Sequence, residues 1–247
     1  MSCTVVLDPG HGGRDPGAVS NGLQEKHLNL QLGLKVAAEL KTEQVLLTRE
    51  SDRFISLQDR VKFAKRADAD IFVSLHVNAG GGRGFESYVY RGLGSNDPAL
   101  DKQAQIHAQV MQVMARWDLP DRGRKQAGFY VLKHNRSPAV LLESLFIDNA
   151  AEAALWREPV FVEALAVGVA RGIEAALSCS STSESDSADP PLQEKDQSNS
   201  ESQALPDMLY TVQVGAFAQR DNARRCLERA RRAGFDDAFI YRKQYQA

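Results

Sequence analysis

Residues 4–13 read TVVLDPGHGG, and the organisation of the chain follows from this stretch. Its first four residues are apolar or β-branched, which predicts a strand covered on both faces of a sheet. A glycine-rich loop follows and lets the backbone approach closely around His11. Ligands of open α/β sheets bind just outside the carboxyl ends of the strands, so His11 stands where such a site would form. Taken alone, the loop would suit an ordinary turn with a surface histidine just as well.

Helix and strand patterns alternate through residues 1–177. The spacing of apolar residues predicts helices over 28–40, 57–64, 106–117 and 159–177. Ser56 is the expected N-cap of the second helix. Short apolar runs predict further strands at 45–47, 71–75, 85–90, 129–132 and 139–142. This alternation predicts an α/β domain in which helices cover both faces of a central, mostly parallel sheet.

The composition restricts the class of protein. With 247 residues, 43% of them hydrophobic and 25% charged, the chain is typical of a globular protein. No stretch approaches the ~18 to 20 apolar residues of a membrane span, so we expect no membrane insertion. The first residues lack the basic and apolar regions of a signal peptide, so we expect a protein that is made in the cytoplasm and meets any outside substrate after release. The three cysteines show no pairing or metal-binding spacing, which indicates reduced thiols.

The C-terminal part divides into two segments of opposite charge. Residues 178–207 hold seven acidic residues against Lys195 and are rich in serine, which predicts a disordered acidic linker. In residues 208–247, eight basic residues face four acidic ones, and strand, helix and strand patterns predict a small β-α-β unit. No aromatic residues interleave with its arginines, so we expect a solvated helix face and no nucleic-acid binding.

Four polar residues lie at expected strand ends or next to a helix start: His11, Glu25, His76 and Glu143. Loops at one edge of a sheet converge, so these residues can share a site. Two histidines and a carboxylate are the protein ligands that a catalytic zinc takes, and a fourth position is left to water. Glu143 would then move protons between that water and a departing amine. Taken singly, each histidine would more often be a structural residue, and Glu25 would suit the first turn of a helix.

The remaining histidines are weaker candidates. We expect His107 on the solvated edge of its helix, and His27 beside Glu25 has no clear role. His134 lies in a loop before a core strand, where it would support the ligands or contact substrate.

Six motifs together resemble the zinc-dependent N-acetylmuramoyl-L-alanine amidases over all of residues 1–177. They are LDPGHGG (7–13), DPGA (15–18), QEK (24–26), LTR (47–49), SLHVNA (74–79) and PAVLLE (138–143). The resemblance implies that His11, Glu25 and His76 bind zinc and that Glu143 is the catalytic acid and base. Substrate contacts are expected at Asn78, His134 and Arg60. Leu145 stands where the family usually has glycine or another small residue, a difference that bears on the local turn more than on the chemistry.

Residues 208–247 resemble half of the SPOR peptidoglycan-binding repeat. A single unit of about forty residues rarely folds alone, so we expect either a truncated copy or pairing with a second chain. Some amidases of the resembled family carry a long insertion over the zinc, and the short loop at residues 91–97 predicts an open cleft that needs no activator protein.

These features predict a zinc enzyme that cuts the amide between N-acetylmuramic acid and L-alanine of peptidoglycan, acting in mother-cell lysis during sporulation. A phage endolysin of the same chemistry is the nearest alternative. A catalytically inactive peptidoglycan-binding protein and a zinc peptidase acting on the stem peptide are two others.

Overall fold

The computed structural model describes residues 3–42 and 44–178. The expected C-terminal β-α-β unit lies outside the described residues, as does the acidic linker apart from Ser178. Ser178 itself is the last residue of helix α6, Pro159–Ser178.

A six-stranded sheet forms the centre of the described part, in the order β4-β1-β5-β8-β6-β7. The strands are β1 (Thr4–Pro9), β4 (Gln44–Leu47), β5 (Ile71–Asn78), β6 (Phe85–Tyr90), β7 (Asp121–Ala127) and β8 (Ala139–Phe146). Only the pairing of β6 with β8 is antiparallel within this sheet, which confirms the prediction of a mostly parallel sheet. Strands β1, β5 and β8 lie at its centre and are buried almost throughout, as their apolar sequences require.

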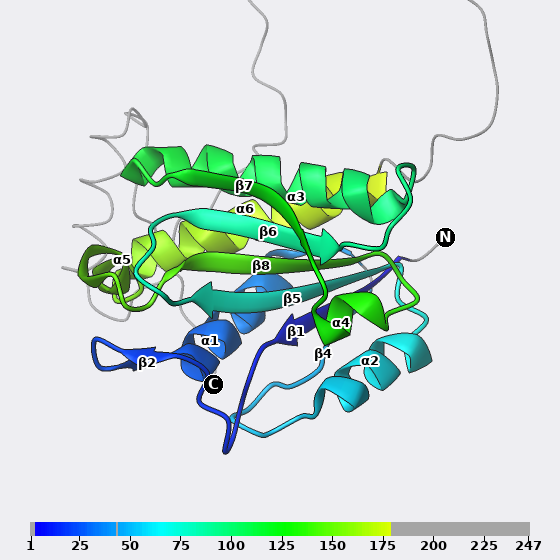
Figure 1. The fold of residues 1–247 in the computed structure, drawn as a ribbon, viewed down its shortest axis with the longest axis horizontal. Coiled ribbons are helices and arrows are strands. Elements are labelled where there is room, and N and C mark those ends of the chain that lie inside the picture. The colour runs from blue at the N-terminus through cyan, green and yellow to red at the C-terminus, as the bar shows by residue number, and fades with distance from the viewer. Residues whose placement is uncertain (1–2, 43, 179–247) are drawn as a thin grey trace, which may run out of the picture. The chain divides into compact units, whose positions relative to one another are not determined.

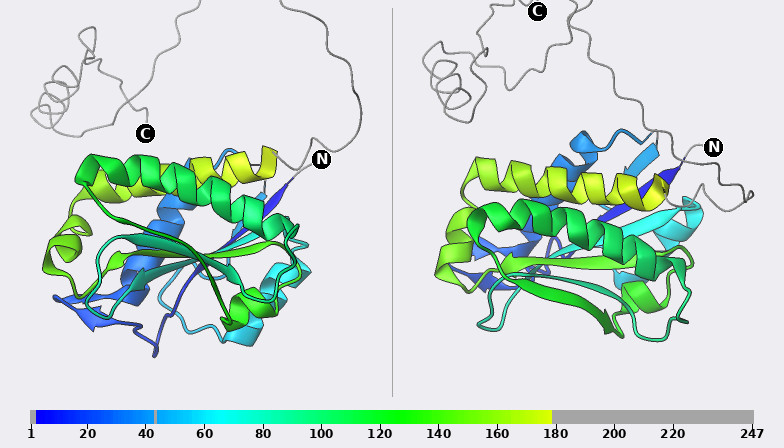
Figure 2. Two further views of the ribbon diagram at one scale, coloured as in Figure 1. Left: turned by 45° about the horizontal axis from the view of Figure 1, so that its top comes forward. Right: turned by 90° about the horizontal axis from the view of Figure 1, so that it is seen from above.

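Three long helices cover one face of the sheet: α1 (Glu25–Glu39), α3 (Pro98–Met114) and α6. Figure 2 shows α3 and α6 side by side, and the main hydrophobic core lies between this helical layer and the sheet. Alternate residues of the central strands point into this core, for example Val73 and Leu75 of β5. The other alternate residues, His76 among them, therefore point to the opposite face.

The opposite face carries two shorter helices, α2 (Leu57–Arg66) and α4 (Tyr130–Lys133). They pack on a smaller apolar cluster that includes Val6, Phe72 and Leu141. On this face the β7 side chains Arg122 and Lys125 stay partly exposed, whereas Glu86 of β6 is buried. The result is an open polar surface beside the strand ends, where a site can be reached from solvent.

Short elements complete the described chain. A hairpin of β2 (Val19–Ser20) and β3 (Leu23–Gln24) precedes α1, the turn η1 (Ala115–Trp117) follows α3, and α5 (Ala150–Leu155) follows β8. Ser56 caps α2 as predicted, because its hydroxyl accepts a hydrogen bond from the backbone N–H of Asp59. Among the described residues, no helix has the length and apolar character needed to cross a bilayer.

The prediction of a strand at 129–132 is wrong. Residues 130–133 form the short helix α4, in which Val131 and Leu132 are both buried, and the strand lies earlier, at β7. Strand β7 reads DRGRKQA and occupies an edge of the sheet with its side chains largely exposed. An edge strand of this kind needs no apolar alternation, so its sequence carries no hydrophobic signal.

Candidate metal and catalytic site

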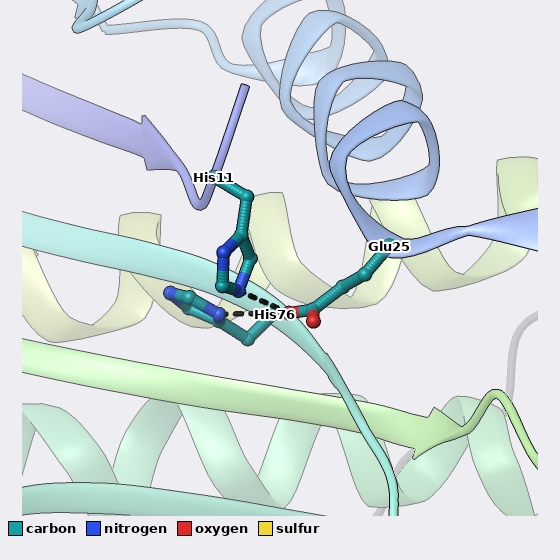
Figure 3. Close-up of side chains that lie close together, drawn as sticks. All are labelled: His11, Glu25 and His76. Atoms are coloured by element: carbon teal, nitrogen blue, oxygen red, sulfur yellow. Dashed lines mark hydrogen bonds and ion pairs between the residues drawn. The ribbon is translucent and has the colours of Figure 1, made fainter. Parts of the chain in front are cut away.

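Three predicted ligands meet at the carboxyl end of the sheet. His11 comes from the loop after β1, Glu25 is the first residue of α1, and His76 lies near the end of β5. One ligand atom from each lies within 4.8 Å of the others, and Figure 3 shows both imidazole rings directed at the Glu25 carboxylate. Glu25 Oε1 lies 3.1 Å from His11 Nε2 and 2.9 Å from His76 Nδ1. The three side chains can therefore hold one metal ion.

Two glycines make this close approach feasible. A Cβ on Gly10 would lie 2.3 Å from His76 Cε1, and a Cβ on Gly17 would lie 2.5 Å from Glu25 Oε2. His11 itself has a φ of 60°, a left-handed conformation that costs energy for a residue with a side chain. Strained backbone of this kind is typical of functional sites that the surrounding structure holds in place.

Hydrogen bonds to neighbouring groups orient His11 and Glu25. Asp15 Oδ2 lies 2.9 Å from His11 Nδ1, which leaves Nε2 directed at the centre. Glu25 is buried, and its carboxylate accepts hydrogen bonds from the backbone N–H of Ala18 at 2.9 Å and of Val77 at 3.2 Å. Asn29, fully buried in α1, adds a bond from Nδ2 to Glu25 Oε1 at 3.3 Å. Such supporting bonds preorganise ligands for a metal.

The charges of the cluster are strongly coupled. Burial would lower the pKa of His11, but hydrogen bonds and the charges of Glu25 and Asp15 raise it to about 9. Burial would raise the pKa of Glu25, but the hydrogen bonds and charges of the two histidines hold it well below its usual range. A buried anion thus faces two ring nitrogens, an arrangement suited to a cation at its centre.

Two buried arginines hold the loop that carries His11. Arg49 donates to the carbonyls of Pro9 and Gly10, each at 2.8 Å. Arg60 donates to Asp8 Oδ1 at 2.6 Å and to the carbonyl of His11 at 2.7 Å.

The structure corrects the prediction that Arg60 contacts substrate. Its side chain is 3% exposed, and its guanidinium bonds to acceptors inside the protein. The physical reason is Asp8, a carboxylate buried in β1 that needs a charged partner.

Glu143 lies beside the cluster. It is the register partner of His76 on β5 and of Glu86 on β6, so all three side chains share the open face of the sheet. Its Oε2 is buried without a hydrogen-bond partner in the described part of the chain, and burial raises the pKa of its carboxyl to about 7. A carboxyl with that pKa can both accept and release a proton near neutral pH.

Asn78 and His134, the two other expected substrate contacts, lie apart from each other. Asn78 ends β5 near Glu143 and donates to Glu86 Oε1 at 2.7 Å. His134 is exposed at the end of α4, stacked on Tyr130 with ring centroids 4.2 Å apart. His134 precedes β8, and Glu143 is the fifth residue of that strand. At the usual rise per residue, Glu143 lies ~13 Å along the strand from its first residue, Ala139.

The expectation of a solvated His107 is wrong. The residue is 6% exposed, and its ring bonds to Ser87 Oγ at 2.8 Å and to Asp121 Oδ1 at 2.9 Å. This chain of hydrogen bonds ties α3 to β6 and β7. The hydroxyl of Ser87 is fully buried, so the arrangement is structural.

Leu145, which differs from the usual small residue of the resembled family, has a φ of 69° and is fully buried. Leu145 lies in a bulge of β8, where Ser144 and Leu145 stand against the single residue Val77 of β5, and its side chain packs in the main core.

Sequence reasoning missed a polar cluster next to Glu143, made of Glu86, Tyr88, Arg122 and Lys125. The alternation in FESYVY, residues 85–90, could have indicated that Glu86 and Tyr88 share a face. The two cations lie in β7, whose polar sequence gave no sign of a strand.

Comparison with known proteins finds two family matches. Residues 5–175 match the N-acetylmuramoyl-L-alanine amidase family, and residues 207–246 match the SPOR domain.

Individual relatives and structures agree with the first match. The sporulation-specific N-acetylmuramoyl-L-alanine amidase of Bacillus subtilis is 42% identical over 240 residues, which cover 96% of this chain and 84% of that protein. The endolysin of Bacillus phage SPP1 is 42% identical over 181 residues, covering 72% and 67%. The crystal structure of an N-acetylmuramoyl-L-alanine amidase from Clostridium difficile 630 superposes with a TM-score of 0.67 at 31% identity, covering 72% of this chain and 97% of that one.

Proposed function

The chain belongs to the N-acetylmuramoyl-L-alanine amidase family, and we propose that it hydrolyses peptidoglycan with a zinc ion held by His11, Glu25 and His76. The bond cut would be the amide between the lactyl group of N-acetylmuramic acid and L-alanine of the stem peptide. The observation that carries this proposal is the convergence of the three side chains within 4.8 Å, next to Glu143.

The donor set fits zinc. Two imidazole nitrogens and one carboxylate are a known ligand set of catalytic zinc sites, in which a fourth position stays open to water or substrate. The hydrogen bond that Asp15 accepts from the His11 ring is the kind of support that histidine ligands of a metal usually have. When bound, zinc supplies a Lewis acid that polarises the scissile carbonyl and acidifies a water molecule.

Glu143 is the group that moves the proton in this proposal. Its unpartnered Oε2 would accept a proton from the attacking water as the new C–O bond forms at the lactyl carbonyl carbon. The same proton would pass to the alanine nitrogen as the C–N bond breaks. The products are a lactyl carboxylate and a stem peptide with a free L-alanine amine.

We propose that the biological setting is sporulation, in lysis of the mother-cell wall. In support, the sporulation-specific relative aligns with 96% of this chain, including the C-terminal segment, whereas the alignment with the phage endolysin covers 72%. The endolysin remains the second candidate because its identity over the aligned part is the same. Deletion of the gene would leave mother cells unlysed after spore maturation if the first setting is correct, and would leave sporulation untouched if the chain belongs to a phage.

Two further proposals concern partners. The matched SPOR domain would hold the enzyme on peptidoglycan and would pair with the same segment of a second chain. Sedimentation of the full chain beside a variant ending at Leu177 tests the pairing, which fails if both are monomers. The short connection between β6 and α3, residues 91–97, supports activity without an activator protein. Purified chain that holds zinc but leaves isolated peptidoglycan intact would contradict that proposal.

The chemistry is tested by labelling new amino termini after digestion of isolated peptidoglycan. New L-alanine amino termini are expected. Amino termini at later stem residues would indicate a peptidase, and no new termini would indicate a binding protein without activity.

A further inference from the structure

The polar cluster beside Glu143 is centred on a buried carboxylate. Glu86 is 3% exposed and accepts hydrogen bonds at both oxygens. Glu86 Oε1 accepts hydrogen bonds from the side-chain amide of Asn78 and the hydroxyl of Tyr88, each at 2.7 Å. Glu86 Oε2 accepts hydrogen bonds from Arg122 Nε at 2.7 Å and from Lys125 Nζ. Glu86 therefore fixes two cations at the rim of the open face.

A bulge in β7 places both cations on that face. In the pairing of β6 with β7, Phe85 lies opposite Asp121 and Ser87 opposite Arg124, so two residues of β7 stand against Glu86 alone. The second of them is Gly123, with a φ of 85°. Without the extra residue, Arg122 and Lys125, three positions apart, would point to opposite faces of the sheet. Bulges beside active sites often redirect a side chain in this way.

The two cations are only partly neutralised by their carboxylate. Arg122 and Lys125 bring two positive charges to the single charge of Glu86, and their side chains are 35% and 36% exposed. Arg122 lies over the ring of Phe146, with its guanidinium carbon 4.8 Å from the centroid. Its Nη1 donates to the carbonyl of Arg83 at 3.5 Å, and no hydrogen bond of Nη2 is found within the described residues. The rim can therefore accept one more anion.

We propose that Arg122 and Lys125 form a subsite for a carboxylate of the stem peptide, an inference that rests on the proposed function. The distance between Glu143 and the two cations suits a short peptide, because β7 is two strands away from β8, or ~10 Å at the usual spacing between strands. A peptide spans up to ~3.3 to 3.6 Å per residue, so a chain leaving Glu143 reaches β7 with its second or third residue. In peptidoglycan the second stem residue is a glutamate whose α-carboxylate is either free or amidated, and the third often carries a further carboxylate.

The experiment compares two synthetic substrates with the full zinc-loaded chain. Both are N-acetylmuramoyl-L-alanyl peptides with a neutral third residue, and they differ only at the second residue, D-glutamate with a free α-carboxylate or its amide D-isoglutamine. We expect Arg122→Gln and Lys125→Gln each to raise KM for the carboxylate substrate about tenfold, the usual worth of one charge-assisted contact, with little change for the amide. Equal effects of each substitution on both substrates would show that the cations only support Glu86, and would overturn the proposal.

The matched control is Arg124→Gln. Arg124 is a cation of the same strand that pairs with Ser87 and therefore faces the helical layer instead of the open face. This substitution should leave both KM values unchanged. An effect equal to that of Arg122→Gln would mean that total charge matters and not the subsite.

Two further arms separate the alternatives. A second substrate pair carries the free or amidated carboxylate only at the third residue, and comparison with the first pair shows which stem residue the subsite binds. If the effect of the substitutions on KM depends on the carboxylate at neither position, the proposal is contradicted. Binding can also be measured without turnover, in the Glu143→Gln background. Adding Arg122→Gln to that variant should raise the dissociation constant of the carboxylate substrate about tenfold. If the wild-type chain cleaves none of these substrates, it is the proposed function that has failed.

Discussion

His76 and Glu143 are register partners on the neighbouring parallel strands β5 and β8. They are far apart in sequence, yet the parallel pairing sets a candidate ligand and a candidate acid and base side by side on the same face. The sheet therefore fixes the distance between the proposed metal site and the proposed proton-transfer group, which loops alone would hold less firmly.

The first prediction concerns Glu143→Gln. The variant should keep its metal, because Glu143 is not among the three clustered ligands, and should lose turnover by about two to four powers of ten. Single-turnover kinetics and metal analysis on one sample measure both. Glu163→Gln, at a side chain 64% exposed on α6, is the control. Near-normal turnover in Glu143→Gln would show that another group moves the proton.

Metal content gives the second prediction. His11→Ala and His76→Ala should each abolish zinc binding together with activity, because two remaining ligands seldom retain zinc. His27→Ala removes a histidine that is 55% exposed and lies 3.5 Å from Asp52, and it should retain a full complement of zinc. Elemental analysis after dialysis measures this, and full zinc in either ligand variant would exclude the proposed site.

The third prediction follows from the buried pair of Arg60 and Asp8. Arg60→Met should lower the free energy of unfolding by about 3 to 5 kcal/mol, since it leaves a carboxylate buried without its charged partner. Lys62→Met, on the same helix but in an exposed pair with Asp59, should change it little. Urea unfolding measures both. An Arg60→Met variant as stable as the wild type would show that Asp8 does not depend on this pair.

Stability at low pH is the fourth prediction. Burial alone would raise the pKa of Glu86, but hydrogen bonds from Lys125, Tyr88 and Arg122 lower it to about 2. A carboxyl whose pKa is lower in the folded state stabilises the protein above its unfolded pKa, and that contribution is lost as the pH falls toward the folded pKa. The wild type should thus lose stability relative to Glu86→Gln between about pH 4.5 and pH 2, by on the order of 1 to 2 kcal/mol after allowance for solvent at the two cations.

The measurement is urea unfolding of both proteins across this range. A constant difference between them at all pH values would mean that the pKa of Glu86 is the same in the folded and the unfolded protein.

The elements that position the site were predictable because their burial leaves a strong signal. Strands β1, β5 and β8 are mostly apolar runs. A polar residue of the site follows β1 (His11) or lies in the second half of the strand, as His76 does in β5 and Glu143 in β8. Burial on both faces demands such runs, so sequence alone indicated which residues would meet at the strand ends.

The parts that were not predictable depend on pairing between distant residues. Strand β7 is polar because it is an edge strand, so nothing in its sequence separates it from a loop. Arg60 and His107 are polar residues on helices and were assigned to substrate and to solvent, but each meets a buried partner, Asp8 and Ser87, from another element. A carboxylate in an apolar strand, as Asp8 is, was the one available sign that a cation must be buried with it.

The central claim is that this site hydrolyses the lactyl amide of peptidoglycan with Glu143 as the proton carrier. Mass spectrometry of a purified muropeptide digested in water enriched in oxygen-18 tests it most directly. The account predicts one heavy oxygen in the lactyl carboxylate of N-acetylmuramic acid and an unlabelled peptide with a free L-alanine amine. Glu143→Gln should form both products slower by about two to four powers of ten. Heavy oxygen in a peptide carboxylate, or equal labelling by the variant, would contradict it.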